Sequence, residues 1–200
     1  MPHDSIVRVA LERIVEALAE AREELDRLDA VASDGNHGEH VLAGATAARD
    51  AALAAPAGRA LADAAEAWGR GQGFANPLWG RMLAAVATKE RSGPVAILDA
   101  ALEVLESSTD ARVGDKSIVD TLTPALTDAR ALLARGESVA DAAAHAAGVA
   151  EEAALETAAI EDRFDASTAD LGFPDPGATS SAVILQAVAD TMADLGGADA

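Results

Sequence analysis

Four stretches rich in Gly, Asp, Asn and Pro carry the side chains best suited to bind an ion or an anion, namely residues 29–38, 69–80, 109–116 and 163–176. In the first, Asp29, Asp34 and Asn36 offer oxygen atoms and His37 offers a ring nitrogen. Hard cations such as Mg²⁺ prefer oxygen ligands and usually keep water and substrate phosphates as well. The spacing is therefore compatible with a magnesium site, but an acidic turn that merely ends a helix would have the same composition.

The second stretch, GRGQGFANPLWG, is a glycine-rich turn that leads into a helix. Asn76 is predicted to cap that helix and Pro77 to occupy its first position. Free amides and the positive end of the helix dipole suit an anion there. The signal is weak, because glycine turns before helices are common and the Gly-Lys-Ser/Thr ending of a P-loop is missing. Trp79 is predicted to be a core or lining residue.

The third and fourth stretches each precede a helix. Asp115 is interpreted as a cap, Lys116 as a phosphate-neutralising or exposed side chain, and Asp120 as a solvated one. Asp175 lies between two prolines, in a rigid entry to a helix that could hold a flat base or a ribose. The simpler reading of Asp175 is an N-cap with a proline-stiffened approach.

The elements that must position these stretches are helices. A heptad-like apolar stripe indicates one long first helix and includes Val7, Leu11, Ile14, Leu18, Leu25 and Leu28. Start signals then recur at Asp4-Ser5, His37, Pro56, Asn76-Pro77, Pro94, Asp115, Ser138 with Asp141, and Asp175-Pro176. We predict an all-α chain, a single antiparallel eight-helix domain over residues 1–200 with no sheet. Alternate loops of such a bundle meet at one end, which brings the four stretches together.

Composition narrows the function further. Hydrophobic residues make up 50% of the chain and aromatic residues 2%, and cysteine is absent. Cysteine nucleophiles and thiolate zinc sites are thereby excluded. The net charge of −19 argues against nucleic acid and anionic lipid as partners and requires local neutralisation of any phosphate ligand. The same acidity could serve only to keep an Ala-rich protein soluble. No secretory signal or membrane span is evident, so we expect a cytoplasmic protein without a membrane partner.

Four motifs occur in order along the chain as LDAVASDGNHG, GQGFANPLWG, GDKSIVD and DPGATSS. Together they resemble the nucleotide-binding L subunit of dihydroxyacetone kinase, also called DhaL, over almost the whole chain. The resemblance implies an antiparallel eight-helix barrel of the DhaL type. It also implies that ADP or ATP binds at one end through two Mg²⁺ ions held by three aspartates. The phosphoryl group would pass to dihydroxyacetone held by a K-type subunit or domain, in one branch with a phosphotransferase-system protein as donor to the bound nucleotide.

Position by position, the resemblance assigns Asp29 and Asp34 to the first two metal-binding aspartates. Asn36 stands at the third, so the site has one negative charge less and one Mg²⁺ rather than two is expected to bind well. The nucleotide-binding positions that follow from the resemblance are His37, Gly38, His40, Phe74, Ala75, Asn76, Ile118, Arg163, Asp175 and Pro176.

Several of these positions depart from the family pattern. Ala75 replaces a phosphate-contacting serine, Asn76 replaces a glycine, and Phe74 replaces a small residue and is expected to narrow the turn. In the stretch EDRFDASTADLGF, where the family has a basic loop before the last motif, Arg163 is the only basic residue. Three hypotheses follow, a phosphotransferase subunit acting on a small ketose, a diverged non-catalytic binding or regulatory protein with a weakened site, and a helical protein whose motifs are unused.

Overall fold

The computed structural model describes residues 3–163 and 170–197. Within them the chain forms eight α-helices, one short 3₁₀ helix and no strand, which confirms the all-α prediction. The helices are α1 (His3–Asp29), α2 (His37–Ala54), α3 (Ala60–Gly69), α4 (Ala75–Lys89), α5 (Pro94–Ser108), α6 (Ile118–Ala134), α7 (Val139–Glu156) and α8 (Pro176–Gly197), with η1 at Thr157–Ala159.

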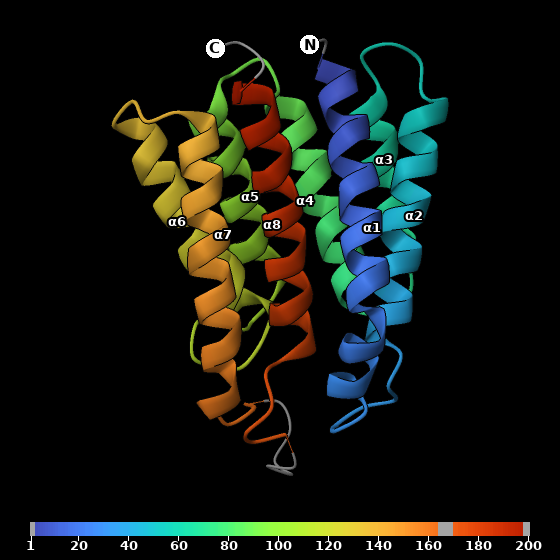
Figure 1. Ribbon diagram of the computed structural model, residues 1–200, viewed down its shortest axis with the longest axis vertical. Helices are drawn as coiled ribbons and strands as arrows, with labels where there is room; N and C mark the ends of the chain where they lie inside the picture. Colours follow the sequence, from blue (N-terminus) through green and yellow to red (C-terminus); the bar gives the residue numbers. More distant parts are fainter. Residues whose placement is uncertain (1–2, 164–169, 198–200) are drawn as a thin grey trace.

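The helices stand side by side as an antiparallel barrel (Figure 1). Each helix packs against the next along the chain, and α8 packs against α1 to close the ring. The apolar stripe predicted on the first helix faces the core, where Leu18 and Leu25 are fully buried. Burying that stripe against the partner helices stabilises the fold by removing apolar surface from water.

Small residues allow neighbouring helices to approach closely. A Cβ atom on Gly80 would lie 2.3 Å from the Cα atom of Gly69, so α3 and α4 touch backbone to backbone at that point. A Cβ atom on Gly38 would lie 2.3 Å from the carbonyl oxygen of Arg22, which joins the first turn of α2 to α1. Gly38 is therefore required for helix packing, whatever further part it has in ligand binding.

The start signals at Pro94 and Ser138 hold, whereas Asp4 has a different partner from the predicted one. Pro94 opens α5, and Ser138 caps α7 by accepting a hydrogen bond from the amide of Asp141 at 3.0 Å. Asp4 does not cap the first helix. Its carboxylate accepts hydrogen bonds from the amides of Gly58, at 2.6 Å, and Ala60, at 3.4 Å, and so holds the start of α3.

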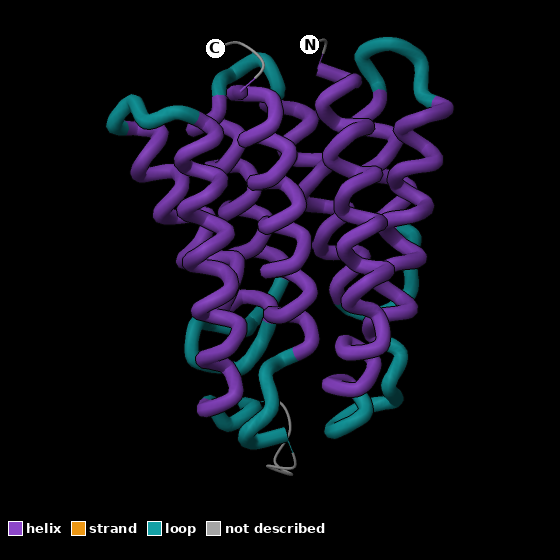
Figure 2. The backbone as a smooth tube through the Cα atoms, viewed as in Figure 1, coloured by secondary structure: helices purple, strands orange, loops and turns teal. Residues whose placement is uncertain are grey.

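Four loops gather toward the lower end of the barrel in Figure 2, as predicted for alternate loops of an antiparallel bundle. They connect α1 to α2, α3 to α4, α5 to α6, and α7 to α8. We call this end the mouth. Helices α2, α4, α6 and α8 all begin there, so the positive ends of four helix dipoles face the same region. Among the described residues, no helix is long and apolar enough to cross a membrane.

Candidate functional site

Two carboxylates at the end of α1 bind the first turn of α2. Asp29 Oδ2 accepts hydrogen bonds from the amides of Asn36, at 2.9 Å, and His37, at 3.3 Å. One turn earlier, Asp26 Oδ1 accepts from the amide of Glu39 at 3.0 Å. Asn36 occupies the N-cap position but makes no capping bond with its own side chain. Acids from the end of α1 thus cap the N-terminus of α2 and hold the loop between the two helices.

The predicted magnesium ligands share this loop without forming a closed cluster. Asp34 is exposed at the tip of the loop, whereas Asp29 and Asn36 are partly buried. Among the described residues, no three His, Cys, Asp or Glu side chains are grouped closely enough to hold a metal ion. Asp29, Asp34 and Asn36 therefore remain a predicted ligand set that contains two carboxylates and one amide.

His37 links the first loop to the last helix across the mouth. Its Nε2 atom lies 2.9 Å from Ser180 Oγ. Burial lowers the pKa of His37 below its usual value, against the opposing effect of the Asp29 and Asp26 carboxylates. The imidazole is therefore neutral at pH 7, and it joins the N-terminal turns of α2 and α8 by a hydrogen bond between neutral groups.

Asn76 has a role other than the predicted one. Helix α4 begins at Ala75, so Asn76 lies inside the helix, 1% exposed, and does not cap it. Its Oδ1 accepts from Trp68 Nε1 at 2.9 Å, and its Nδ2 donates to the carbonyl oxygens of His40, at 2.8 Å, and Gln72, at 2.7 Å. A buried amide with these three bonds is well satisfied. Asn76 thereby ties α3, α2 and the α3–α4 loop together.

The α3–α4 loop is more open than the sequence suggested. Phe74 is 64% exposed, so it points into solvent and the expectation that it narrows the turn is wrong. Ala75 is buried at the start of α4. Gly73 has φ +80° and packs beside His40, with its Cβ position 3.4 Å from His40 Nδ1. The turn therefore lies against α2 with its bulky side chain directed outward. Trp79 is buried and stacks on Trp68, as predicted for a core residue.

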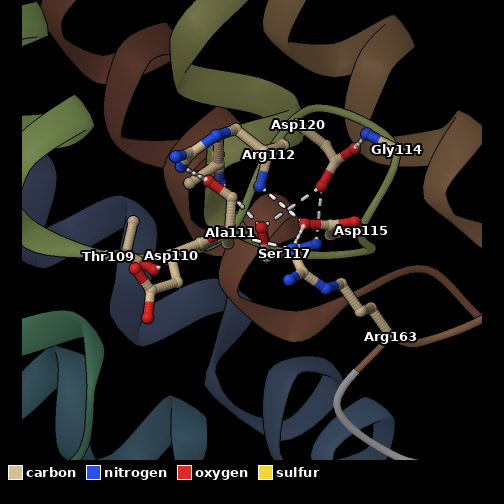
Figure 3. Close-up of polar contacts among 10 residues, drawn as sticks. Thr109, Asp110, Ala111, Arg112, Gly114, Asp115, Ser117, Asp120 and Arg163 are labelled. Atoms are coloured by element: carbon tan, nitrogen blue, oxygen red, sulfur yellow. Dashed lines mark hydrogen bonds and ion pairs between the residues drawn. The ribbon is translucent and has the colours of Figure 1, made fainter.

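Figure 3 shows the polar network of the α5–α6 loop. Ser117, not Asp115, is the N-cap of α6, and Asp120 completes a capping box by accepting from the Ser117 amide at 2.7 Å. Asp120 also accepts from the amide of Gly114 at 2.5 Å and is only 4% exposed. The predictions of Asp115 as cap and of Asp120 as solvated are both wrong, because the loop folds back over Asp120.

The α7–α8 loop is tied to the α5–α6 loop on both sides of residues 164–169. Before them, the Arg163 guanidinium donates to Asp115 Oδ2 at 2.7 Å and to the carbonyl oxygen of Asp110 at 3.2 Å (Figure 3). The hydrogen bond from Arg163 lowers the pKa of Asp115, and the Arg112 amide adds to this effect. After them, Lys116 Nζ lies 3.0 Å from Asp170 Oδ2 and donates to the Asp170 carbonyl oxygen at 2.8 Å.

Lys116 is 3% exposed, so the alternative that it lies exposed is wrong. It is the one non-glycine residue among those described with positive φ, at +60°. Such a conformation costs free energy and persists where the surrounding contacts require it. The charge of Lys116 is already paired with Asp170, whose other carboxylate oxygen is buried without a hydrogen-bond partner in the described part of the chain.

Asp175 caps α8, as predicted. Its Oδ1 accepts from the amide of Ala178 at 2.6 Å, and its own amide donates to Thr157 Oγ1 at 2.8 Å. Burial raises the pKa of Asp175 to about 7, the Ala178 amide opposes this, and the negative charges of Asp120 and Asp162 add to it. Pro176 opens α8, and the Cβ position of the next residue, Gly177, lies 3.5 Å from Ile118 Cβ. The N-termini of α6 and α8 are therefore adjacent.

Comparison with known proteins identifies the fold. The family model of the DAK2 domain matches residues 31–190. The chain belongs to the DAK2 domain family. It is 35% identical to a D-erythrulose kinase of Mycolicibacterium smegmatis over 94% of this chain and 35% of that protein. It is 34% identical to an L-erythrulose kinase of Pectobacterium atrosepticum over 84% of this chain and 32% of that protein.

Solved structures agree with this assignment. The dihydroxyacetone kinase of C. freundii in its native form superposes with a TM-score of 0.73 at 25% identity, over 93% of this chain and 34% of that one. The same kinase in complex with AMP-PNP and Mg²⁺ gives a TM-score of 0.72 at 24% identity, over 93% and 34%. The barrel is thus the DhaL fold expected from the motifs, and the chain spans about a third of the length of the relatives it matches.

Sequence reasoning missed several residues of the mouth. Asp26 lies three residues before Asp29 on the same helical face, a spacing that could have marked it as a second cap. Ser180 stands inside the last motif, so its place near the site could be expected. The Lys116–Asp170 pair spans 54 residues, and no local pattern in the sequence indicates such a contact.

Proposed function

We propose that this DAK2 domain is the nucleotide-binding part of a kinase that phosphorylates a small ketose. Mg-ADP or Mg-ATP would bind at the mouth, and the acceptor hydroxyl would belong to a ketose held by a K-type subunit or domain. The names of the sequence relatives favour a four-carbon ketose, erythrulose, over dihydroxyacetone as the acceptor. A phosphotransferase-system protein remains an alternative source of the phosphoryl group.

The observation that carries this proposal is the convergence of four helix N-termini and all four motif loops at one mouth. Phosphoryl transfer depends mostly on positioning and on neutralising charge around the phosphates. Backbone amides at helix N-termini can bind phosphate oxygens in a protein whose overall charge is −19. Arg163 at the α7–α8 loop, whose guanidinium donates to Asp115 Oδ2 and to the Asp110 carbonyl oxygen, is the proposed basic contact for the nucleotide. The Asp175–Pro176 corner is the proposed contact for the base or the ribose.

The α1–α2 loop fits one hard cation in the type of its donors. Asp34 and Asn36 offer a carboxylate and an amide oxygen, and Asp29 Oδ1 makes no hydrogen bond within the described residues while Oδ2 caps α2. A bound Mg²⁺ would neutralise charge on the phosphates. The loop does not fit a pair of ions as well, because only two of the three side chains are charged and two adjacent dications repel each other.

A second candidate function is a non-catalytic nucleotide-binding or regulatory protein of the same fold. The observation that favours it is the lack of a three-carboxylate cluster among the described residues. The alanine at position 75, where the family has a phosphate-contacting serine, points the same way. Both candidates require a nucleotide to bind at the mouth, but only the first transfers a phosphoryl group.

Calorimetry of the isolated chain with ADP and ATP, with and without Mg²⁺, tests the binding step. We expect metal-dependent binding that Asp34→Asn weakens about tenfold or more, since that exposed side chain contributes charge but caps no helix. Asp50→Asn is the matched control, because Asp50 is exposed and lies within α2, away from its first turn. Absence of binding at millimolar nucleotide would refute the proposal. Nucleotide binding without phosphorylation of D-erythrulose, when the chain is combined with a K-type subunit or domain, would favour the second candidate.

A further inference from the structure

Exposed apolar side chains collect at the mouth. Of the eight large hydrophobic residues that the described chain exposes, five lie at that end, and we call them the apolar rim: Phe74, Val113, Leu155, Leu171 and Phe173. Their exposed fractions run from 37% to 64%, so each offers surface to a partner. Both phenylalanines that the structure describes belong to the rim, and aromatic side chains are enriched among residues that dominate binding energy.

Two of the loops that carry the apolar rim are held by contacts within the chain. Phe173 lies under the Arg27 guanidinium, 6.0 Å from the centre of its ring, which ties the α7–α8 loop to the end of α1. The Lys116–Asp170 ion pair ties the same loop to the one that carries Val113. A surface held in this way loses little conformational entropy on association.

Charge decides between a second copy of the chain and a different partner. Two copies would each bring a net charge of −19 to the contact, so self-association is opposed electrostatically. Exposed acids, Asp34, Asp110 and Glu161, stand on the loops that carry or flank the rim. A partner surface with apolar pockets bordered by Lys or Arg would complement both the apolar side chains of the rim and the acids beside them.

We propose that the apolar rim is the docking surface for the ketose-binding part of the kinase. This inference rests on the proposed function, because the acceptor hydroxyl has to reach a phosphoryl donor at the mouth. The matched relatives carry about two thirds of their length outside the region that resembles this chain, which is ample for a partner of that kind. Phe74 is therefore an anchor for the partner, which accounts for a bulky aromatic side chain held out in solvent.

The test uses a chimera of the D-erythrulose kinase of Mycolicibacterium smegmatis in which residues 1–200 of this chain replace the matching region. Amide hydrogen exchange is compared between the chimera and the free 200-residue chain. We expect slower exchange in the chimera at the loops that carry Phe74, Val113 and Phe173, and equal exchange at the opposite end of the barrel. Equal exchange at both ends would overturn the proposal.

A pair of double variants then tests the side chains themselves. Val113→Ser with Phe173→Ser removes two rim anchors and is expected to lower D-erythrulose phosphorylation by the chimera about tenfold or more. Leu53→Ser with Val139→Ser is the matched control, because these residues are 56% and 46% exposed at the other end. Equal losses in the two double variants, or none in either, would contradict the docking surface.

Two further measurements keep this proposal separate from the function it rests on. Nucleotide binding by the free chain depends on the mouth alone, so its absence refutes the proposed function even where the rim is protected in the chimera. Sedimentation of the free chain reports self-association, and a dimer abolished by Val113→Ser with Phe173→Ser would show that a second copy occupies the rim, against the proposal.

Discussion

Lys116 and Asp170 form a buried ion pair, with Nζ 3.0 Å from Oδ2, that joins the α5–α6 loop to the α7–α8 loop. Lys116→Met would leave a mostly buried carboxylate without its cation. We expect this to lower the free energy of unfolding by about 3 kcal/mol, as for other buried pairs that lose one partner. Urea denaturation followed by circular dichroism measures the change.

The exposed pair of Arg130 and Asp99 supplies the control for Lys116. Arg130→Met should cost much less than Lys116→Met, because Arg130 and Asp99 are both solvent-exposed and Asp99 stays hydrated when its partner is removed. Adding Asp170→Leu to Lys116→Met should recover much of the loss, since no unpaired buried charge then remains. A cost for Lys116→Met no larger than that for Arg130→Met would contradict the importance assigned to the buried pair.

Asp175 predicts a pH-dependent stability with a defined sign. Its pKa is raised from 3.8 to about 7, so between these values the folded state binds more protons than the unfolded state. The contribution of Asp175 to stability therefore falls as pH rises from about 4 to about 7. Asp175→Asn keeps an oxygen for the Ala178 amide without the charge. It should stabilise the protein by up to about 4 kcal/mol at pH 8 and by little at pH 4. A difference independent of pH would refute this.

The diverged positions of the proposed site can be restored together. Asn36→Asp supplies the third carboxylate of the family pattern, and Ala75→Ser supplies a hydroxyl at the buried start of α4. We expect the double variant to bind Mg-nucleotide about tenfold or more tightly than the natural chain, from one charged ligand and one hydrogen bond. Calorimetry with Mg²⁺ and with EDTA measures the gain, and an unchanged affinity would exclude these two positions as the cause of a weakened site.

Replacing glycine by alanine is expected to destabilise the protein at Gly44 and to stabilise it at Gly148. A Cβ atom on Gly44 would lie 2.3 Å from Asn76 Oδ1 and 2.9 Å from Trp68 Cδ1, so Gly44→Ala should cost about 2 kcal/mol or more. Gly148 lies in an exposed part of α7 with open space around it, so Gly148→Ala should add about 0.5–1 kcal/mol through helix propensity. Thermal unfolding of both variants decides whether the Asn76 cluster is as tightly packed as described.

The helices were predictable because their signals are local. The stripe through Leu11, Leu18 and Leu25 repeats with the period of a helix, and the caps at Ser138 and Asp175 lie within one turn of the amides that they bind. The common end of the four loops follows from the alternation of antiparallel helices. These patterns depend on the geometry of the helix itself, and at these positions no distant contact overrides them.

The contacts of polar side chains were predictable only in part, because several partners are distant in sequence. Asp4 has its partner 54 residues away, and the buried pair of Lys116 and Asp170 spans the same separation. Asn76 has the composition of a cap, yet Trp68 and the carbonyl oxygen of His40 recruit it into the core. Asp120 has the spacing of a solvated helical acid, and only the path of the preceding loop buries it.

Helices α2, α4, α6 and α8 begin at the same end, so their N-termini create a local positive potential in a protein whose net charge is negative. An anionic guest diffusing toward the protein meets the long-range repulsion of 19 excess negative charges and meets the attraction of the helix ends only at short range. Salt screens the first of these far more than the second. Added salt should therefore speed up the arrival of a nucleotide while leaving its departure nearly unchanged, the reverse of the behaviour of a basic phosphate-binding protein.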